Sequence, residues 1–230
     1  KEIYRVNKNI VLVLMNGRPL TIQWEAENIP TIVEAWHLGS MAGHGIADVL
    51  TGKYNPSGKL TMTFPKSEGQ IPIYYNHKMT GRPTSIPPEL IFYSHNMDVN
   101  NTPLFPFGYG LSYSTFEYSD IQLDKTSMKS GDKLAISVSV TNTSEVDGEE
   151  VVQLYVRDLV GSIPRPIKEL KGFKKIMISA GETVEVNFEI TEADLSFYRK
   201  DLSFGTEPGD FHVFVGPNSR DLKVAEFTLD

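Results

Sequence analysis

The second half of the chain consists of short runs in which apolar and polar residues alternate. Leu134, Ile136 and Val138 are separated by single small or polar residues, and the same alternation recurs at 184–190 and 211–215. Successive side chains of a strand point to opposite faces, so each run predicts a strand with one buried face. About seven such strands, separated by turns that contain Gly or Pro, predict an immunoglobulin-like or fibronectin-type sandwich. The absence of cysteine favours the fibronectin type.

The first 65 residues follow a different pattern, in which apolar runs alternate with a helical segment. Ile10–Met15 is a continuous apolar run that ends in a turn at Asn16–Pro19. Such runs are typical of strands that are covered on both faces. Thr31–Leu38 and Leu60–Phe64 predict further strands, and Gly39–Leu50 predicts a helix packed close to a sheet. Strands that alternate with helices indicate an α/β layer.

The stretch between these two parts predicts neither helix nor strand. Prolines recur at positions 65, 72, 83, 87, 88, 103 and 106, together with many Asn, Ser and Gly residues. A connection this long without regular structure is uncommon inside a compact domain. We therefore predict part of an α/β domain over residues 1–65, a linker or surface loop over 66–110, and an all-β sandwich over 111–230.

Charge and composition argue against several classes of protein. The formal net charge is −7, which disfavours a nucleic-acid partner. The most basic stretch, Arg165–Lys175, also contains Glu169 and apolar residues, so it fits a solvated strand edge. No apolar run reaches the length of a membrane span. Without cysteine the chain has neither a disulfide nor a thiolate metal site. The sequence predicts no nucleic-acid, membrane, metal or cofactor binding.

Glu34 is the carboxylate in the most suggestive position, because it lies inside a predicted apolar strand. A buried carboxylate has a raised pKa and can act as an acid. The alternative, which we favour, is a residue at the end of the strand that binds backbone amides. Two histidines, His37 and His44, flank a predicted turn and could approach each other. Their spacing is not that of a metal site, so a structural role is predicted.

Aromatic residues cluster where the sandwich is expected to begin. They are Phe105, Phe107, Tyr109, Tyr113, Phe116 and Tyr118. Aromatic faces can stack on sugars, but aromatic side chains also bury large areas between packed elements. We favour packing that holds one domain against the other over a sugar-binding role.

The segment 74–83 (YYNHKMTGRP) brings aromatic, amide, imidazole and cationic groups together in a predicted loop. Functional groups concentrate on loops that a scaffold holds in place. Tyr75, His77 and Arg82 are therefore candidate substrate-binding residues. The alternative is an ordered surface linker without contact to a substrate.

Four stretches together resemble a known family. They are Val11–Pro19 (VLVLMNGRP), Ala35–Gly52 (AWHLGSMAGHGIADVLTG) continuing to Asn55–Pro65 (NPSGKLTMTFP), Phe105–Phe116 (FPFGYGLSYSTF), and Val151–Asp158 (VVQLYVRD) with Arg165–Phe173 (RPIKELKGF). In this order and spacing they are similar to the C-terminal portion of a glycoside hydrolase of family three, the β-glucosidase and β-xylosidase group. The loop Gln70–Pro83 resembles the bacterial β-glucosidase branch.

The resemblance implies a fold and a mechanism. It implies the C-terminal part of a flavodoxin-like α/β layer followed by a fibronectin type III-like sandwich, in an enzyme whose barrel domain comes first. The barrel would supply an Asp nucleophile and the α/β domain a Glu acid/base, in a retaining mechanism with a glycosyl-enzyme intermediate and no cofactor. No carboxylate of this chain matches either position. We therefore expect no catalytic residue here and no activity of the chain by itself.

Three functions remain open at this point. The chain is a fragment of a β-glucosidase that acts on oligosaccharides or glycosides, a non-catalytic carbohydrate-binding module, or a structural domain pair that mediates assembly. An α/β sheet that is cut midway leaves an unpaired edge and apolar faces, which predicts a homo-oligomer formed through that edge. The resemblance and the absence of cysteine indicate a periplasmic or extracellular protein.

Overall fold

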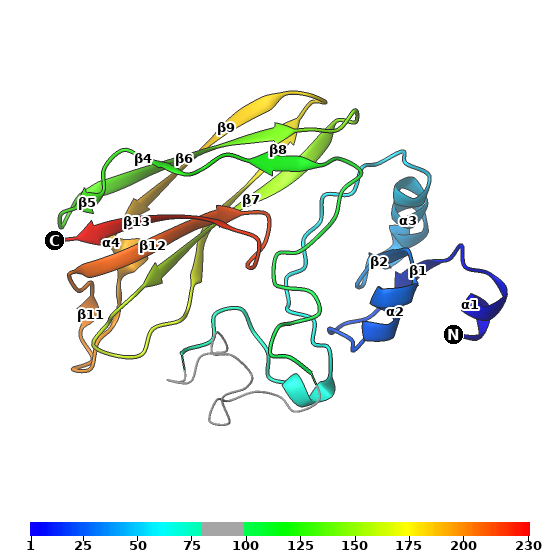
Figure 1. Ribbon diagram of the computed structural model, residues 1–230, viewed down its shortest axis with the longest axis horizontal. Coiled ribbons are helices and arrows are strands. Elements are labelled where there is room, and N and C mark those ends of the chain that lie inside the picture. Colours follow the sequence, from blue (N-terminus) through cyan, green and yellow to red (C-terminus); the bar gives the residue numbers. More distant parts are fainter. Residues whose placement is uncertain (80–98) are drawn as a thin grey trace.

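The computed structural model describes residues 1–79 and 99–230. An α/β piece at the N-terminus and a β-sandwich at the C-terminus lie side by side, and two connecting segments run between them (Figure 1). In the described part, no helix is both long enough and apolar enough to cross a bilayer.

The α/β piece contains two parallel strands with short helices. Its elements are α1 (Glu2–Val6), β1 (Val11–Leu14), α2 (Gln23–Asn28), β2 (Thr31–Glu34), η1 (Gly39–Met41) and α3 (Ala42–Leu50). The β1 and β2 strands pair in register from Val11 with Thr31 to Leu14 with Glu34. The predicted strands at Ile10–Met15 and Thr31–Leu38 and the predicted helix are confirmed, with shorter strands than expected. The second strand ends early because Trp36 has a φ of 47° and turns the chain.

The predicted strand at Leu60–Phe64 is wrong. This segment joins no sheet of the described chain and instead runs antiparallel to the connection that enters the sandwich. The Leu60 N–H donates to the Tyr109 carbonyl at 2.7 Å, and the Phe64 N–H donates to the Phe105 carbonyl at 2.9 Å. Phe64 is 1% exposed, so its apolar side chain is buried against that connection and not in the α/β layer. The hydrophobic pattern identified an extended segment but not its partner.

The α/β piece buries few large side chains. Within residues 1–65 the buried apolar residues are Ile22, Ala35 and Phe64. Many large apolar side chains are exposed instead, namely Ile3, Val6, Val11, Met15, Leu38, Met41, Leu50, Tyr54 and Met62. Exposed apolar surface of this extent marks an interaction face. The two strands therefore lack a complete core of their own.

The sandwich consists of a five-stranded and a four-stranded sheet. The first has the order β5-β13-β12-β7-β8, and in the second β3, β4 and β9 all pair with β6. The bounds are β3 (Phe116–Tyr118), β4 (Gln122–Leu123), β5 (Ser127–Met128), β6 (Lys133–Asn142), β7 (Gly148–Asp158), β8 (Glu169–Ile178), β9 (Thr183–Thr191), β12 (Gly209–Gly216) and β13 (Lys223–Leu229). A one-turn helix α4 (Glu192–Leu195) and the hairpin β10 (Phe197–Tyr198) and β11 (Phe204–Gly205) follow β9, and η2 (Glu68–Gln70) lies in the linker.

The core of the sandwich is formed by the alternating residues that the sequence indicates. Leu134, Ile136 and Val138 from one sheet face Leu154 and Val213 from the other, and all five are at most 2% exposed. The predicted fibronectin-type alternation is confirmed. Strand β8 is an edge strand, as predicted for the basic stretch, but the Arg165 and Lys171 side chains are only 12% and 19% exposed.

Candidate functional site

The most elaborate polar site of the described chain is the junction between the α/β piece and the sandwich. It centres on the extended segment Asn55–Leu60. Alternate side chains of an extended chain point the same way, and here Asn55, Ser57 and Lys59 all reach the sandwich or the segment that leads into it. We refer to this contact region as the domain junction.

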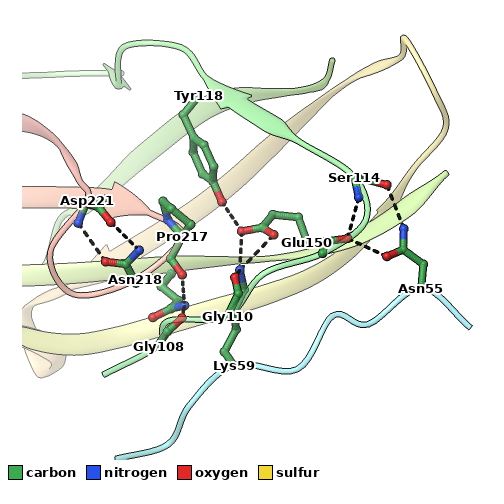
Figure 2. Close-up of polar contacts among 12 residues, drawn as sticks. Asn55, Lys59, Gly108, Gly110, Ser114, Tyr118, Glu150, Pro217, Asn218 and Asp221 are labelled. Atoms are coloured by element: carbon green, nitrogen blue, oxygen red, sulfur yellow. Dashed lines mark hydrogen bonds and ion pairs between the residues drawn. The ribbon is translucent and has the colours of Figure 1, made fainter. Parts of the chain in front are cut away.

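Lys59 and Glu150 form an ion pair at the centre of the domain junction (Figure 2). The Lys59 amine lies 3.1 Å from both Glu150 oxygens and also donates to the Gly110 carbonyl at 3.2 Å. The side chains are 12% and 3% exposed. Glu150 has the same parity along β7 as the core residues Val152 and Leu154, so its carboxylate points between the two sheets. A lysine of the α/β piece thus neutralises a charge at the end of the sandwich core.

Tyr118 completes this ion pair from the opposite sheet. Its hydroxyl donates to a Glu150 oxygen at 2.9 Å. Burial, followed by the negative charge of Glu150, raises the pKa of the Tyr118 hydroxyl, so that it remains a neutral donor at ordinary pH. The Glu150 carboxylate is therefore bound by Tyr118 from the opposite sheet and by Lys59 from the α/β piece. These contacts stabilise the buried charge.

Glu149 makes the neighbouring contacts of the domain junction. Tyr54 and Ser57 donate to its Oε2 at 3.0 and 3.1 Å, and Lys175 forms an ion pair with the same oxygen at 2.7 Å. The hydrogen bond from Lys175, followed by the one from Tyr54, lowers the pKa of the Glu149 carboxyl. Consecutive acidic residues of β7 are thus both used for packing between the two parts.

Asn55 ties the α/β piece to the sandwich entry through both ends of its amide. Its Nδ2 donates to the Ser114 hydroxyl and to the Asp147 carbonyl, each at 2.9 Å. Its Oδ1 accepts from the Ser112 hydroxyl and the Tyr113 N–H, each at 2.8 Å. An amide with every group paired across two chain segments fixes their relative position.

Gln153 holds the other side of the domain junction. Its Nε2 donates to the Gly108 carbonyl at 3.1 Å and to the Pro217 carbonyl at 2.6 Å, and its Oε1 accepts from the Tyr155 hydroxyl. Gly108 has a φ of 78°, and a Cβ there would lie 2.0 Å from the Gln153 Oε1. Only glycine permits this approach, because both its backbone conformation and the available space exclude a side chain.

The aromatic cluster packs between the two parts, as predicted. Phe105 stacks on Tyr109 with ring centroids 5.3 Å apart and meets Phe64 edge-on at 6.1 Å. The Tyr113 hydroxyl donates to the Val49 carbonyl at the end of α3. The favoured interpretation, packing that holds the domains together, is thereby confirmed.

Two of the three candidate substrate-binding residues, Tyr75 and His77, belong to the described part of the chain. Tyr75 is half-buried, stacks on Phe107 at 4.5 Å and accepts the Leu170 N–H at 3.3 Å. His77 is exposed, and its carbonyl accepts the Ile167 N–H at 3.0 Å. Arg82 lies outside the described residues. The loop is therefore ordered against the sandwich up to Met79, and its substrate-binding role stays a prediction.

Glu34 has the role that we favoured from the sequence. One oxygen accepts the Trp36 N–H at 3.0 Å and the other accepts from Asn16 at 3.3 Å. It is a half-buried residue at the end of β2 that binds a backbone amide.

The His37 ring lies close to Gly17, where a Cβ would come within 3.0 Å of its Nε2. Over residues 1–79 and 99–230, no group of three or more acidic or histidine side chains is placed to hold a metal ion.

The sequence did not reveal the residues of the domain junction as a site. Asn55, Ser57 and Lys59 lie within a motif that carried the family resemblance, but nothing in their spacing indicates a distant partner. One signal was present: Glu150 occupies an inward position in the alternation of β7, and a buried charge requires a partner. Lys59 lies 91 positions away.

Comparison with known proteins identifies the family. Residues 1–113 match the glycosyl hydrolase family 3 C-terminal domain, and residues 150–219 match the fibronectin type III-like domain. A periplasmic β-glucosidase of Salmonella typhimurium is 46% identical over 96% of this chain, and a β-xylosidase of Formosa agariphila is 45% identical over all of it. The crystal structure of a β-glucosidase from Listeria innocua in complex with glucose superposes with a TM-score of 0.93 at 44% identity over 99% of this chain.

The matched proteins are much longer than this chain. The chain covers 29% of the Salmonella relative, 31% of the Formosa relative and 32% of the Listeria chain. It thus spans about a third of the length of the relatives that it matches. The chain belongs to glycosyl hydrolase family 3, of which it comprises the C-terminal domain followed by a fibronectin type III-like domain.

Proposed function

We propose that this chain is the C-terminal part of a retaining β-glucosidase that removes terminal β-linked glucose from oligosaccharides or glycosides. The observation that supports this most strongly is the match over nearly the whole chain, at 44–46% identity, to β-glucosidases. A β-xylosidase matches almost equally well, and the choice of glucose over xylose is part of the proposal.

We assign a positioning role to this chain within that enzyme. Retaining hydrolysis needs two carboxyl groups about 5 Å apart, one as nucleophile and one as acid/base. The two junction carboxylates, Glu149 and Glu150, are instead each neutralised by a lysine. We therefore propose that both catalytic carboxylates belong to polypeptide outside this chain, and that the domain junction holds the α/β piece in a fixed position relative to the sandwich.

Assays on an aryl β-glucoside test this proposal. The chain by itself is expected to release no aglycone above the uncatalysed background, because both proposed catalytic carboxylates lie outside it. The same chain joined to the remaining two thirds that its relatives have is expected to turn over the substrate. Replacement of either proposed catalytic carboxylate in the longer protein is the control. Turnover by the isolated chain at an enzyme-like rate would contradict the proposal.

We also propose that the α/β piece depends on association for its stability. Ile3, Val6 and Met41 are between 64% and 86% exposed, and β1 and β2 form a pair without further strands in the described chain. Such a face is stabilised by the polypeptide that normally covers it or by a second copy of the chain. A homo-oligomer through this edge is the expected state of the isolated chain.

Limited proteolysis of the isolated chain, followed by mass spectrometry, compares the stability of the α/β piece with that of the sandwich. The first cuts are expected within residues 1–65, and the sandwich with its buried core is expected to persist. Size-exclusion chromatography with light scattering then reports the mass before and after digestion. Early loss of the sandwich with residues 1–65 intact would disprove the proposed order of stability.

Three further proposals rest on the same family assignment. We retain the division into an α/β part over 1–65, a linker over 66–110 and a sandwich over 111–230. A relative named as periplasmic supports a periplasmic or extracellular location. We also retain the substrate contacts of the loop that carries Tyr75, His77 and Arg82, supported by the exposure of His77 on an ordered segment.

A further inference from the structure

A cavity of about 220 Å³ lies where this loop meets the connection between β7 and β8. Met79 contributes from the loop, Arg157 and Asp158 from the end of β7, and Gly161 and Arg165 from the connection. The volume falls just below the roughly 300–1,000 Å³ of pockets for drug-sized ligands. The cavity therefore has room for about one sugar ring.

Asp158 supplies a buried acceptor to this cavity. Its side chain is 7% exposed, and its Oδ1 accepts the Val160 N–H at 3.2 Å. Its Oδ2 lies 3.4 Å from the Arg165 Nε. Burial raises the pKa of the Asp158 carboxyl, and the Arg165 charge partly offsets this effect. One carboxylate oxygen therefore has an ion-pair partner but retains room to accept a further hydrogen bond.

Arg165 supplies a buried donor with no acceptor. Its Nη2 donates to Glu169 at 2.9 Å, and the guanidinium lies over the Phe197 ring with 4.0 Å to the centroid. Its Nε–H is buried and forms no hydrogen bond within the described part of the chain, since the contact with Asp158 is not aligned for one. A buried donor without a hydrogen bond costs free energy, and the Asp158 carboxylate 3.4 Å away offsets part of this cost by its charge.

Arg157 adds a cation with a poor partner. Its Nη2 donates to the Met79 sulfur at 3.1 Å, and a thioether sulfur is a weak acceptor. No carboxylate of the described residues forms an ion pair with it. Its charge also contributes, after burial, to the lowered pKa of the Lys168 amine. The guanidinium is thus available to donate to an oxygen in the cavity.

The remaining walls are apolar, formed by Leu159, Val160, Ile163 and Pro164. A sugar ring presents hydroxyl groups that both donate and accept, together with apolar C–H faces. Asp158 can accept from one hydroxyl while the arginines donate to others, and the apolar wall covers a C–H face. An anion would also meet the arginines, but the Asp158 carboxylate on the same wall repels it.

We propose that this cavity binds a monosaccharide, either free or as the terminal residue of a glycan. The ligand class follows from the donors, acceptors and volume of the cavity, so binding does not depend on the proposed hydrolysis. The site would give the sandwich a sugar-binding role in addition to its structural one.

NMR titration of the ¹⁵N-labelled chain with methyl β-D-glucopyranoside tests the proposal. Saturable shifts are expected for the Arg157 guanidinium and for the backbone amides of Val160 and Gly161, because these residues line the cavity. The chemical shifts of core amides such as that of Val213 are expected to stay unchanged. Inorganic phosphate is titrated in parallel. Absence of shifts with the glucoside, or shifts with phosphate only, would overturn the proposal.

Two variants with matched controls test the residues. Arg157→Ala is expected to weaken binding about tenfold, the loss of one hydrogen bond from a charged donor, whereas Lys200→Ala, which removes an exposed cation of the same sandwich, leaves binding unchanged. Gly161→Ala places a methyl group 2.8 Å from Arg165 Cγ and 3.1 Å from Asp158 Oδ2, and is expected to abolish binding.

Gly209→Ala is the control for that variant, since nothing lies within 4 Å of its new Cβ. Unchanged core amides in each spectrum establish that a variant is folded. Unchanged affinity in a folded Arg157→Ala chain would refute the assignment of the cavity as a sugar site.

Discussion

Replacement of Lys59 by methionine is expected to lower the free energy of unfolding by about 3–5 kcal/mol, as is typical when one partner of a buried ion pair is removed. The reason is the position of Glu150. Its carboxylate is 3% exposed and points between the two sheets, and Lys59 is its cationic partner within ion-pair distance. Tyr118 donates a hydrogen bond to it but brings no charge. The variant therefore leaves an uncompensated negative charge at the end of the core.

Urea denaturation followed by circular dichroism measures this loss. Lys53→Met is the matched control, because Lys53 forms an ion pair with Asp48 on the surface, with side chains 74% and 38% exposed. Surface pairs contribute about 0–1 kcal/mol, so the control is expected to change little. In the double variant Lys59→Met with Glu150→Gln, part of the stability is expected to return, since the buried charge is gone. Equal effects of Lys59→Met and Lys53→Met would show that Glu150 does not need its partner.

Replacement of Gly108 by alanine is expected to cost about 3 kcal/mol and to loosen the domain junction. The new Cβ would lie 2.0 Å from Gln153 Oε1 and 2.8 Å from its Cδ. Gln153 cannot swing away without losing its bonds to the Gly108 and Pro217 carbonyls and to Tyr155. Overpacking of this kind costs about 1–3 kcal/mol, and the left-handed backbone adds roughly 1–2 kcal/mol for a residue with a side chain.

Gly131→Ala separates these two effects. Gly131 has a φ of 82°, similar to that of Gly108, but nothing lies within 4 Å of an added Cβ. This control is therefore expected to show only the backbone cost, about 1–2 kcal/mol. Thermal unfolding of both variants gives the comparison. The steric role assigned to Gln153 would be excluded by equal losses in the two variants.

Glu34 illustrates how far local sequence information extends. Its place in an apolar run suggested burial, and the end of the strand suggested backbone amides as partners. The structure supports the second interpretation. Trp36 lies just after the end of β2, and Asn16 lies just after the end of the paired strand β1. Partners that are near in sequence, or that follow from parallel pairing, can be anticipated in this way.

The alternation of apolar residues by itself determined the sandwich and the identity of its core. Leu134, Ile136 and Val138 had to share one face whatever their partners were, because side chains of a strand alternate. The apolar run at Ile10–Met15 similarly required a strand. The glycine and proline signals located the turns, since few other residues adopt those backbone conformations.

Only the tertiary structure decided how the two parts are joined. Leu60–Phe64 has the pattern of a strand, but its partner is the connection at 104–109, and the pattern carries no information about a partner. Lys59 and Glu150 are 91 positions apart, and the inward position of Glu150 indicates a buried charge but not its partner. The two charges can be buried together only when both parts have folded. Removing either charge from water is unfavourable unless the other charge is in contact with it.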